Sequence, residues 1–156
     1  MVFTDFIFDG RIGDLKVGDS IDNIEMKFEI ISKEEGDIPS LFELIYIKKC
    51  FQVTTLRNKV IGMSFDFDYK IKRLYTVKFE NISCDLGYNF SFNDFLFFIK
   101  KTNLKFEILN QDMENCIEIL ILKSNVHLKF INSNFSNLQK VYIFDLNLYN
   151  AIRKLI

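Results

Sequence analysis

Alternation of apolar and polar residues in several short runs is the feature that most constrains this fold. The runs 61–69 and 75–79 place an apolar residue at every second position. Successive side chains of a β-strand point to opposite faces, so this pattern predicts strands with one buried face. Arg57-Asn58 lies between two such runs and is a candidate tight hairpin, because Asn tolerates positive φ. Short strands with close connections favour an antiparallel sheet.

Two segments carry the signals of helices. Ser91 followed by Asp94 has the form of an N-cap with an acidic side chain in the first turn, where the helix dipole favours it. The residues that follow place apolar side chains at i, i+3, i+4 and i+7, the stripe of an amphipathic helix. Ser20, with Asp22 just inside, is a less complete start of the same kind. A further helix over 148–156 is expected to cover an edge of the sheet.

The chain also repeats itself. The tetrapeptide Lys-Phe-Glu-Ile occurs at 27–30 and again at 105–108, each time after a helix-start signal. A polar loop, an apolar run at 43–48 or 118–123, and an alternating strand at 51–56 or 126–131 follow the two copies in the same order. Such self-similarity is the signature of a duplicated supersecondary unit. We therefore predict a tandem repeat of a helix plus β-meander over 12–66 and 84–145, in which both tetrapeptides are strands.

These signals together predict an α+β fold, in which an antiparallel sheet carries two helices on one face. The chain has 156 residues, about one domain by the usual size prior, and no linker composition separates its halves. We expect a single domain over 1–156. No apolar run approaches the roughly 20 residues of a membrane-spanning helix, and the N-terminus lacks the pattern of a secretory signal.

The side chains that catalysis most often uses are scarce. There is one His, His127, which alternation turns outward, and the three Cys residues are widely spaced. That spacing fits neither a disulfide framework nor a metal-binding pair, and favours free thiols in a reducing compartment. Asp66 and Asp68 share one strand face but have no obvious third ligand for a cation. We expect no enzyme, no metal and no cofactor.

Charge is unevenly distributed although the net charge is only −1. Residues 1–43 hold eleven acidic against four basic side chains, and the remainder is net positive. Such asymmetry indicates a charged partner for one section, or else chance dispersion over a solvated surface. A chain this close to neutral is a poor general nucleic-acid binder. The candidate partner-binding residues are Asp14, Asp19, Asp22, Glu25, Glu29, Glu34, Glu35 and Asp37.

The segment 12–24 reads Ile-Gly-Asp-Leu-Lys-Val-Gly-Asp-Ser-Ile-Asp-Asn-Ile. It resembles the G-x-L-x-(hydrophobic)-G-x-S opening of small immunity proteins from bacterial polymorphic-toxin and contact-dependent growth inhibition loci. The segment 58–66 is similar to the closing strand of that unit. The resemblance covers under half of the chain, or most of it if the second repeat counts.

The resemblance implies a small, cytoplasmic, non-catalytic protein that neutralises its cognate toxin by occluding the active site. Many such toxins are nucleases, whose active sites are basic because they hold phosphate. An acidic inhibitor surface would then speed encounter and supply complementarity. We therefore expect a basic toxin domain as partner, and neither nucleic acid nor membrane. The alternative function is another protein-interaction, assembly or chaperone module without a toxin partner.

Overall fold

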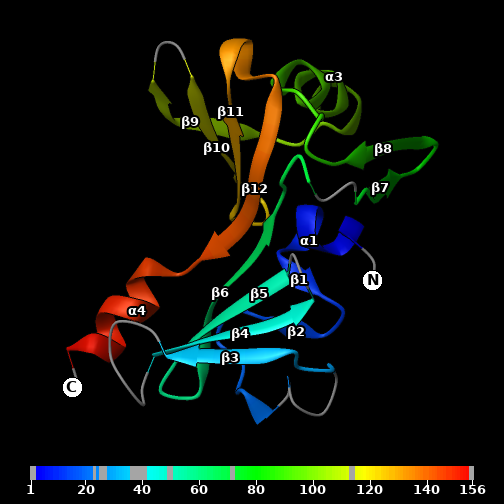
Figure 1. Cartoon of the computed structure of the whole chain (residues 1–156). Coiled ribbons are helices and arrows are strands. Elements are labelled where there is room, and N and C mark those ends of the chain that lie inside the picture. Colours follow the sequence, from blue (N-terminus) through cyan, green and yellow to red (C-terminus); the bar gives the residue numbers. More distant parts are fainter. Residues whose placement is uncertain are drawn as a thin grey trace. The chain divides into compact units, whose positions relative to one another are not determined.

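A computed structural model shows a mixed α+β fold with mostly antiparallel strands and three short α-helices among the residues it describes (Figure 1). The described residues are 3–22, 24, 28–35, 42–48, 51–70, 73–112 and 115–154. The α+β prediction with antiparallel pairing is confirmed. None of the described helices has the length and apolar character needed to cross a bilayer.

The chain divides into two compact units. Unit 1 combines Met1–Gly13 with Asp66–Val141, and unit 2 combines Asp14–Phe65 with Tyr142–Ile156. Each unit is therefore built from two separate stretches of sequence. The prediction of a single domain over the whole chain stays a prediction.

Unit 1 holds a four-strand antiparallel meander in the order β12-β11-β10-β9. Its elements are α1 (Phe3–Asp9), β1 (Arg11–Ile12), β7 (Tyr75–Phe79), β8 (Ile82–Leu86), α3 (Phe92–Thr102), β9 (Phe106–Asp112), β10 (Cys116–Ile121), β11 (Val126–Ile131), the 3-10 turn η1 (Ser133–Phe135) and most of β12 (Asn137–Phe144). The strands predicted at 75–79 and 126–131 have those bounds.

Helix α3 packs its aromatic stripe on this meander. The ring of Phe95 lies 5.3 Å from that of Phe106 on β9, nearly perpendicular to it, and 6.0 Å from that of Phe130 on β11. Ser91 caps the helix as predicted, because its side chain accepts the N–H of Asp94 while the Asp94 carboxylate accepts the N–H of Ser91. The cap and the stripe act together, since the cap places the start of the helix and the rings place its buried face.

Helix α1 and strand β8, which forms a hairpin with β7, were not predicted from the sequence. Four of the seven residues of α1 are buried, and two of their rings stack on the hairpin. Phe3 stacks on Tyr75 at 4.9 Å and Phe8 on Phe79 at 4.8 Å. The backbone N–H of Lys78 also donates to the Thr4 hydroxyl. In Figure 1 the hairpin accordingly lies between α1 and α3.

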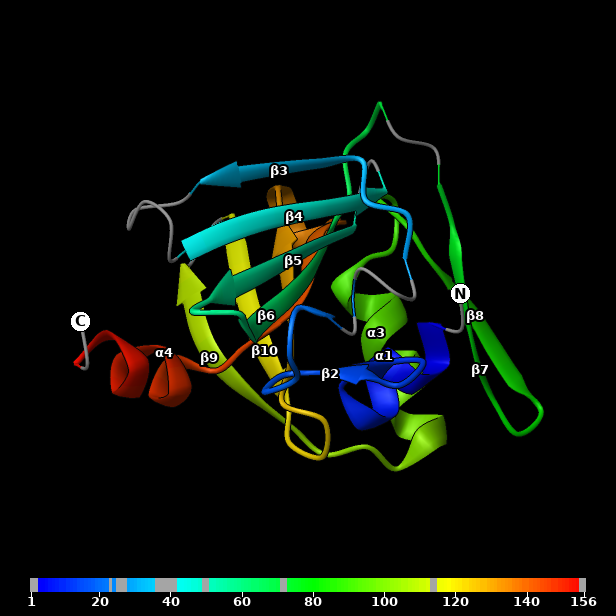
Figure 2. The same ribbon diagram turned by 90° about the horizontal axis from the view of Figure 1, so that it is seen from below.

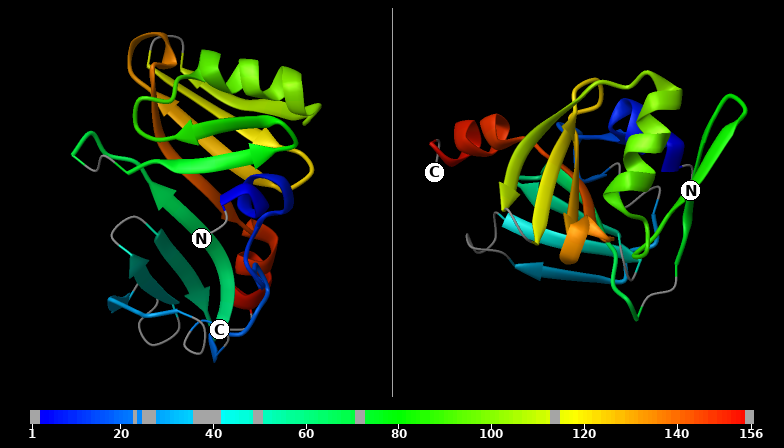
Figure 3. Two further views of the ribbon diagram at one scale, coloured as in Figure 1. Left: turned by 90° about the vertical axis from the view of Figure 1, so that its right-hand side faces the viewer. Right: turned by 90° about the horizontal axis from the view of Figure 1, so that it is seen from above.

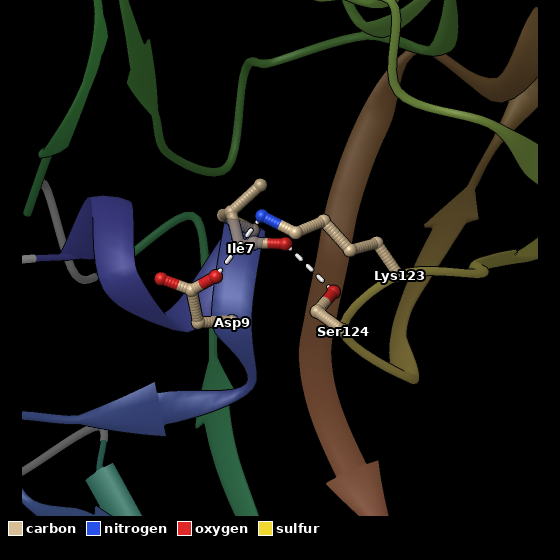
Figure 4. Close-up of polar contacts among 4 residues, drawn as sticks. All are labelled: Ile7, Asp9, Lys123 and Ser124. Atoms are coloured by element: carbon tan, nitrogen blue, oxygen red, sulfur yellow. Dashed lines mark hydrogen bonds and ion pairs between the residues drawn. The ribbon is translucent and has the colours of Figure 1, made fainter.

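Two polar contacts tie the end of α1 to the turn between β10 and β11 (Figure 4). The hydroxyl of buried Ser124 donates to the carbonyl of Ile7 at 2.7 Å, and Lys123 pairs with Asp9 at 3.1 Å. The Ser124 bond satisfies one of the carbonyl groups that every helix leaves unpaired in its last turn. The ion pair is largely exposed and contributes little by comparison.

Unit 2 holds a second antiparallel meander in the order β3-β4-β5-β6, seen strand beside strand in Figure 2. Its elements are β2 (Leu15–Lys16), β3 (Ser32–Glu35), β4 (Phe42–Lys48), β5 (Phe51–Leu56), β6 (Lys59–Asp66, of which Asp66 belongs to unit 1), the last residues of β12, and α4 (Leu146–Arg153). The strand predicted at 51–56 has those bounds. The predicted hairpin at Arg57-Asn58 is confirmed, with φ of 49° and 61° at the two residues.

The burial of β6 departs from the predicted alternation. Val60, Ile61, Gly62 and Met63 are all buried, so the middle of the strand is covered on both faces. Gly62 explains part of this, because a Cβ there would come within 2.9 Å of the Phe144 ring and 3.0 Å of a backbone oxygen. The end of β12 thus approaches β6 more closely than any larger residue allows.

Three further expectations have mixed outcomes. The tetrapeptide at 105–108 lies at the start of β9, but residues 28–30 form no strand, and β3 begins only at Ser32. That part of the repeat prediction is wrong, because the chain at 28–30 follows the end of a helical turn in which the N–H of Phe28 donates to Ile24. The C-terminal helix exists but begins two residues earlier than predicted. Cys84 and Cys116 are free, and Cys50 lies outside the described residues.

Candidate functional site

The glycine-containing motif at 12–24 has a defined conformation around its second glycine. Gly18 has a φ of +94°, a region that residues with a side chain rarely adopt. Its N–H donates to the carbonyl of Val60 at 2.8 Å, and the N–H of Val60 donates back to Asp19. The N–H of Ile21 reaches the carbonyl of Asn58 at 2.9 Å. The motif therefore runs along the hairpin that joins β5 and β6.

Two of the three acidic side chains of this motif, those of Asp19 and Asp22, make local hydrogen bonds. The carboxylate of Asp19 accepts the backbone N–H of Lys16 at 3.0 Å and closes a turn. The carboxylate of Asp22 accepts the Ser20 hydroxyl at 3.1 Å, and the Ser20 oxygen in turn faces the Asp22 N–H. These contacts stabilise the start of the helical segment, as side chains at an N-cap do. Asp19 and Asp22 thus have structural roles whether or not a partner binds.

A second group of acidic residues lies at the opposite end of the strand order, on β3. All four residues of this strand are exposed, and no described strand pairs with its outer edge. Its inner edge pairs with β4, which places Lys33 opposite Ile45, Glu34 opposite Leu44 and Glu35 opposite Glu43. We call Glu34, Glu35 and Glu43 the acidic edge.

The acidic edge contains a repulsive pair. Glu35 and Glu43 face each other directly across β3 and β4, where side chains on one face have Cβ atoms about 5 Å apart. Two carboxylates in that position repel, and a cationic group from a partner would relieve the repulsion that Lys33, two residues before Glu35 on the same face, leaves between them. Glu34 points to the other face, where the Tyr46 hydroxyl donates to its carboxylate at 3.4 Å. The acidic edge therefore presents negative charge on both faces of the strand pair.

The structure separates the predicted site residues rather than gathering them. Asp19 and Asp22 lie beside β6, whereas Glu34 and Glu35 lie on β3, with β4, β5 and β6 between the two pairs. Asp14 and Glu29 are exposed at other positions of unit 2. Glu25 and Asp37 lie outside the described residues.

Sequence reasoning missed Glu43 and Tyr46 as members of this site. Both lie on β4, which the apolar run 43–48 had already indicated as a strand. The signal that could have found Glu43 is its place at the start of that run, where an acidic residue would face the preceding strand of a meander. Its partner Glu35 could not be identified without the register of β3 against β4, because a slip of one residue would turn each side chain of β3 to the other face.

Other candidate groups in the described residues are held in structural contacts. His127 is half-buried rather than outward, and its Nδ1 lies 3.0 Å from a Glu118 oxygen. Asp66 pairs with Lys140 at 3.4 Å, and Asp68 accepts the N–H of Lys70. The described part of the chain holds no group of three side chains suited to a metal ion.

The thiol of Cys84 on β8 has a pKa well above its ordinary value. Burial, with the nearby carboxylates of Asp85 and Asp94, raises the pKa of Cys84 to about 12. The thiolate is the nucleophilic form of cysteine, so this side chain is unreactive at neutral pH. Nothing in its surroundings suits it to covalent chemistry.

Comparison with known proteins adds no family to this description. No protein family, curated protein or solved structure matches the chain. The resemblance to immunity proteins at 12–24 and 58–66 therefore stays a prediction from the sequence. The structure gives physical reasons for three residues of the 12–24 motif, since Leu15 is buried, Gly18 needs its positive φ and Ser20 starts a helix.

Proposed function

We propose that this chain is a non-catalytic immunity protein that binds and neutralises a cognate bacterial toxin. The observation that carries the proposal is the acidic edge, three carboxylates on an open strand and its neighbour. The motif at 12–24 supports it separately through its resemblance to immunity proteins. The protein would act in the cytoplasm, without cofactor, metal, nucleic acid or membrane as a partner.

The acidic edge suits a basic partner for two physical reasons. Opposite potentials raise the rate of encounter, and charges that match across an interface exclude partners of the wrong sign. A nuclease is the toxin class in which a basic surface coincides with the active site, because that site holds phosphate. A lysine or arginine of the toxin placed between Glu35 and Glu43 would also remove their mutual repulsion.

We favour a smaller set of binding residues than the acidic set predicted from the sequence. Asp19 and Asp22 are engaged in a turn and a helix start, so replacing them would disturb folding as well as charge. Glu34 and Glu35 lie on a strand whose four side chains are all exposed. We therefore place the main contact at β3 and β4.

We also propose that the two meanders derive from one duplicated unit. In support, β3-β4-β5-β6 and β9-β10-β11-β12 are both consecutive antiparallel meanders. A helical segment precedes each of them, α3 in unit 1 and the turn around Ile24 in unit 2. An experimental structure in which the two meanders superpose strand for strand would support the duplication, and one in which strand order or direction differs would refute it.

The experiment that tests the function begins with capture of the tagged protein's partner from its own cells, identified by mass spectrometry. The association rate of that purified partner is then measured for the wild type and for Glu34→Lys/Glu35→Lys, at low and high salt. We expect the variant to associate about tenfold more slowly at low salt, with a flatter salt dependence.

Glu80→Lys/Glu107→Lys is the matched control, because it changes the net charge equally at two exposed positions of unit 1. The proposal predicts that this control associates like the wild type and that the captured partner loses its toxic activity when bound. A partner without toxic activity would instead favour the assembly or chaperone alternative. Equal association rates for the two double variants would refute the acidic edge as the contact.

A further inference from the structure

Unit 1 contains a groove that plays no part in the proposed function. It runs between β8 and α3 and has a volume of about 600 Å³. Figure 1 and the left view of Figure 3 both show the β7–β8 hairpin passing beside α3, with β8 on the helix side. Every residue that lines the groove belongs to unit 1.

One wall of the groove is the free edge of a β-strand. Among the described residues β8 pairs only with β7, in the register Val77 opposite Cys84 and Lys78 opposite Ser83. Phe79 and Ile82 flank a two-residue turn, so they form a hydrogen-bonded pair, and such pairs alternate along an antiparallel ladder. The N–H and C=O groups of Ser83 and Asp85 consequently point away from β7. They are available to a further strand.

Leu74, next to Gly87 on the β8 side of the groove, is 64% exposed. The opposite wall is α3, on which the Phe97 ring is 62% exposed. The Lys101 ammonium lies 4.1 Å from the centre of the Phe97 ring, which gives that wall a cation as well as an aromatic surface. Cys84 and Ile82 face inward from β8, so a strand added at this edge would turn the side chains opposite Cys84 and Ile82 toward α3 as well.

The two ends of the groove carry opposite charges. Asp85 and Asp94 lie near one end, both close enough to Cys84 to act on its thiol. Asp85 also accepts a hydrogen bond from the Thr76 hydroxyl at 2.6 Å, which fixes its carboxylate. Lys101 lies near the other end, in the last turn of α3. A strand running antiparallel to β8 begins at the acidic end and finishes at the basic end.

We propose that this groove binds an extended peptide segment of a partner protein, which adds to β8 as an antiparallel third strand. The segment would carry a basic residue opposite Asp85, an apolar residue opposite Cys84, and an acidic residue opposite Ile82, on the face of the strand that is turned toward Lys101. Backbone hydrogen bonds to Ser83 and Asp85 would supply affinity, and the charged ends would set the direction. The proposal does not depend on the acidic edge of unit 2.

The test is an NMR titration of the 15N-labelled full chain with two blocked pentapeptides. The first, acetyl-Lys-Val-Thr-Glu-Thr-amide, places its Lys opposite Asp85 and its Glu opposite Ile82, on the face toward Lys101, and the second exchanges its Lys and Glu. We expect the first to shift amide signals of β8 and α3 and to bind about tenfold more tightly than the second. Binding of both peptides with equal affinity, or no shifts at millimolar peptide, would overturn the proposal.

Two lysines that are neighbours on α3 provide a matched pair of variants. Lys101→Glu reverses the basic end of the groove, whereas Lys100→Glu makes the same change at a residue that does not line it. Both remove a favourable charge from the last turn of the helix, so their effects on stability should be similar. We expect Lys101→Glu to weaken the first peptide about tenfold and Lys100→Glu to leave it within about twofold. If the two variants weakened peptide binding equally, the peptide would be responding only to net charge, and binding in the groove would be refuted.

Discussion

The first strands of the two meanders, β3 in unit 2 and β9 in unit 1, both lie at an edge but are held in different ways. β9 starts with Phe106, whose ring packs against Phe95 of the helix above it. β3 has no buried residue and is joined to its unit through its ladder with β4. One strand is fixed by helix–sheet packing, and the other by backbone pairing.

The side chains on these edges differ accordingly. β9 exposes Ile108 and Leu109, at 51% and 46%, while β3 exposes charged Lys33, Glu34 and Glu35. A register shift next to Ile119 disturbs the pairing of β9 with β10, and such irregularities discourage edge-to-edge association. The charged side chains of β3 likewise discourage edge-to-edge association, and they also attract an oppositely charged partner. The comparison teaches that equivalent edges can be protected by geometry in one unit and by charge in the other.

The largest expected effect comes from breaking the anchor of β9. Phe95→Ala removes a ring that is 2% exposed and should lower the free energy of unfolding by about 3–5 kcal/mol, as large cavities in packed cores do. Urea denaturation measures this loss, and amide exchange should show β9 losing protection. Phe97→Ala on the same helix is the control, because its exposed ring should cost within about 0.5 kcal/mol. Equal losses for the two variants would mean that Phe95 does not anchor the strand.

A smaller effect separates the two helix starts. Ser91→Ala removes one half of a reciprocal capping box and should cost about 1 kcal/mol. Ser20→Ala removes a 3.4 Å contact from the Asp22 N–H and should cost less, because a hydrogen bond of that length is weak. Thermal or urea unfolding of both variants ranks them. A larger loss for Ser20→Ala would reverse the difference that we draw between the units.

An effect that is absent at neutral pH and appears only at alkaline pH concerns the hairpin of unit 1. The folded state keeps Cys84 protonated because its pKa is raised from 9.0 to about 12. A raised pKa stabilises the fold fully below pH 9, and this contribution is lost as the pH rises from 9 towards 12. The free energy of unfolding should therefore fall more steeply over that window in the wild type than in Cys84→Ala, with no difference in slope near pH 7. If the free energy of unfolding of the two proteins changed in parallel up to pH 12, the fold would not raise the pKa of the Cys84 thiol.

Several strands could be predicted because their alternation reflects one buried face, as at β5, β7 and β11. β6 could not, since its burial depends on the close approach of Phe144 to Gly62, a contact between residues far apart in the sequence. α1 was missed although Phe3, Phe6 and Ile7 have helical spacing. Seven residues without a capping signal are too few to indicate a helix, and its stability comes from rings on β7.

The candidate site was harder to predict, because closeness in sequence does not make a surface patch. Asp22 and Glu34 are twelve positions apart, yet the strands of the meander lie between them. Glu35 and Glu43 are directly opposite because of the register of β3 and β4, which composition does not contain. The charge balance of the sequence identified the acidic section, but only the fold determines which of its acidic side chains lie close together.

The hydrogen bond from Ser124 to Ile7 spans 117 positions of the sequence, and the 14–65 stretch of unit 2 lies between its ends. On a ribosome, β3 to β6 therefore emerge together and can pair while α1 still waits for β7 and the β10–β11 turn. The buried rings of Phe3 and Phe6 stay in water throughout this interval. Contacts of such long sequence separation make folding slow, and exposed aromatic surface makes the waiting chain prone to aggregation. We therefore expect the order of synthesis to influence how much of this protein reaches its native state.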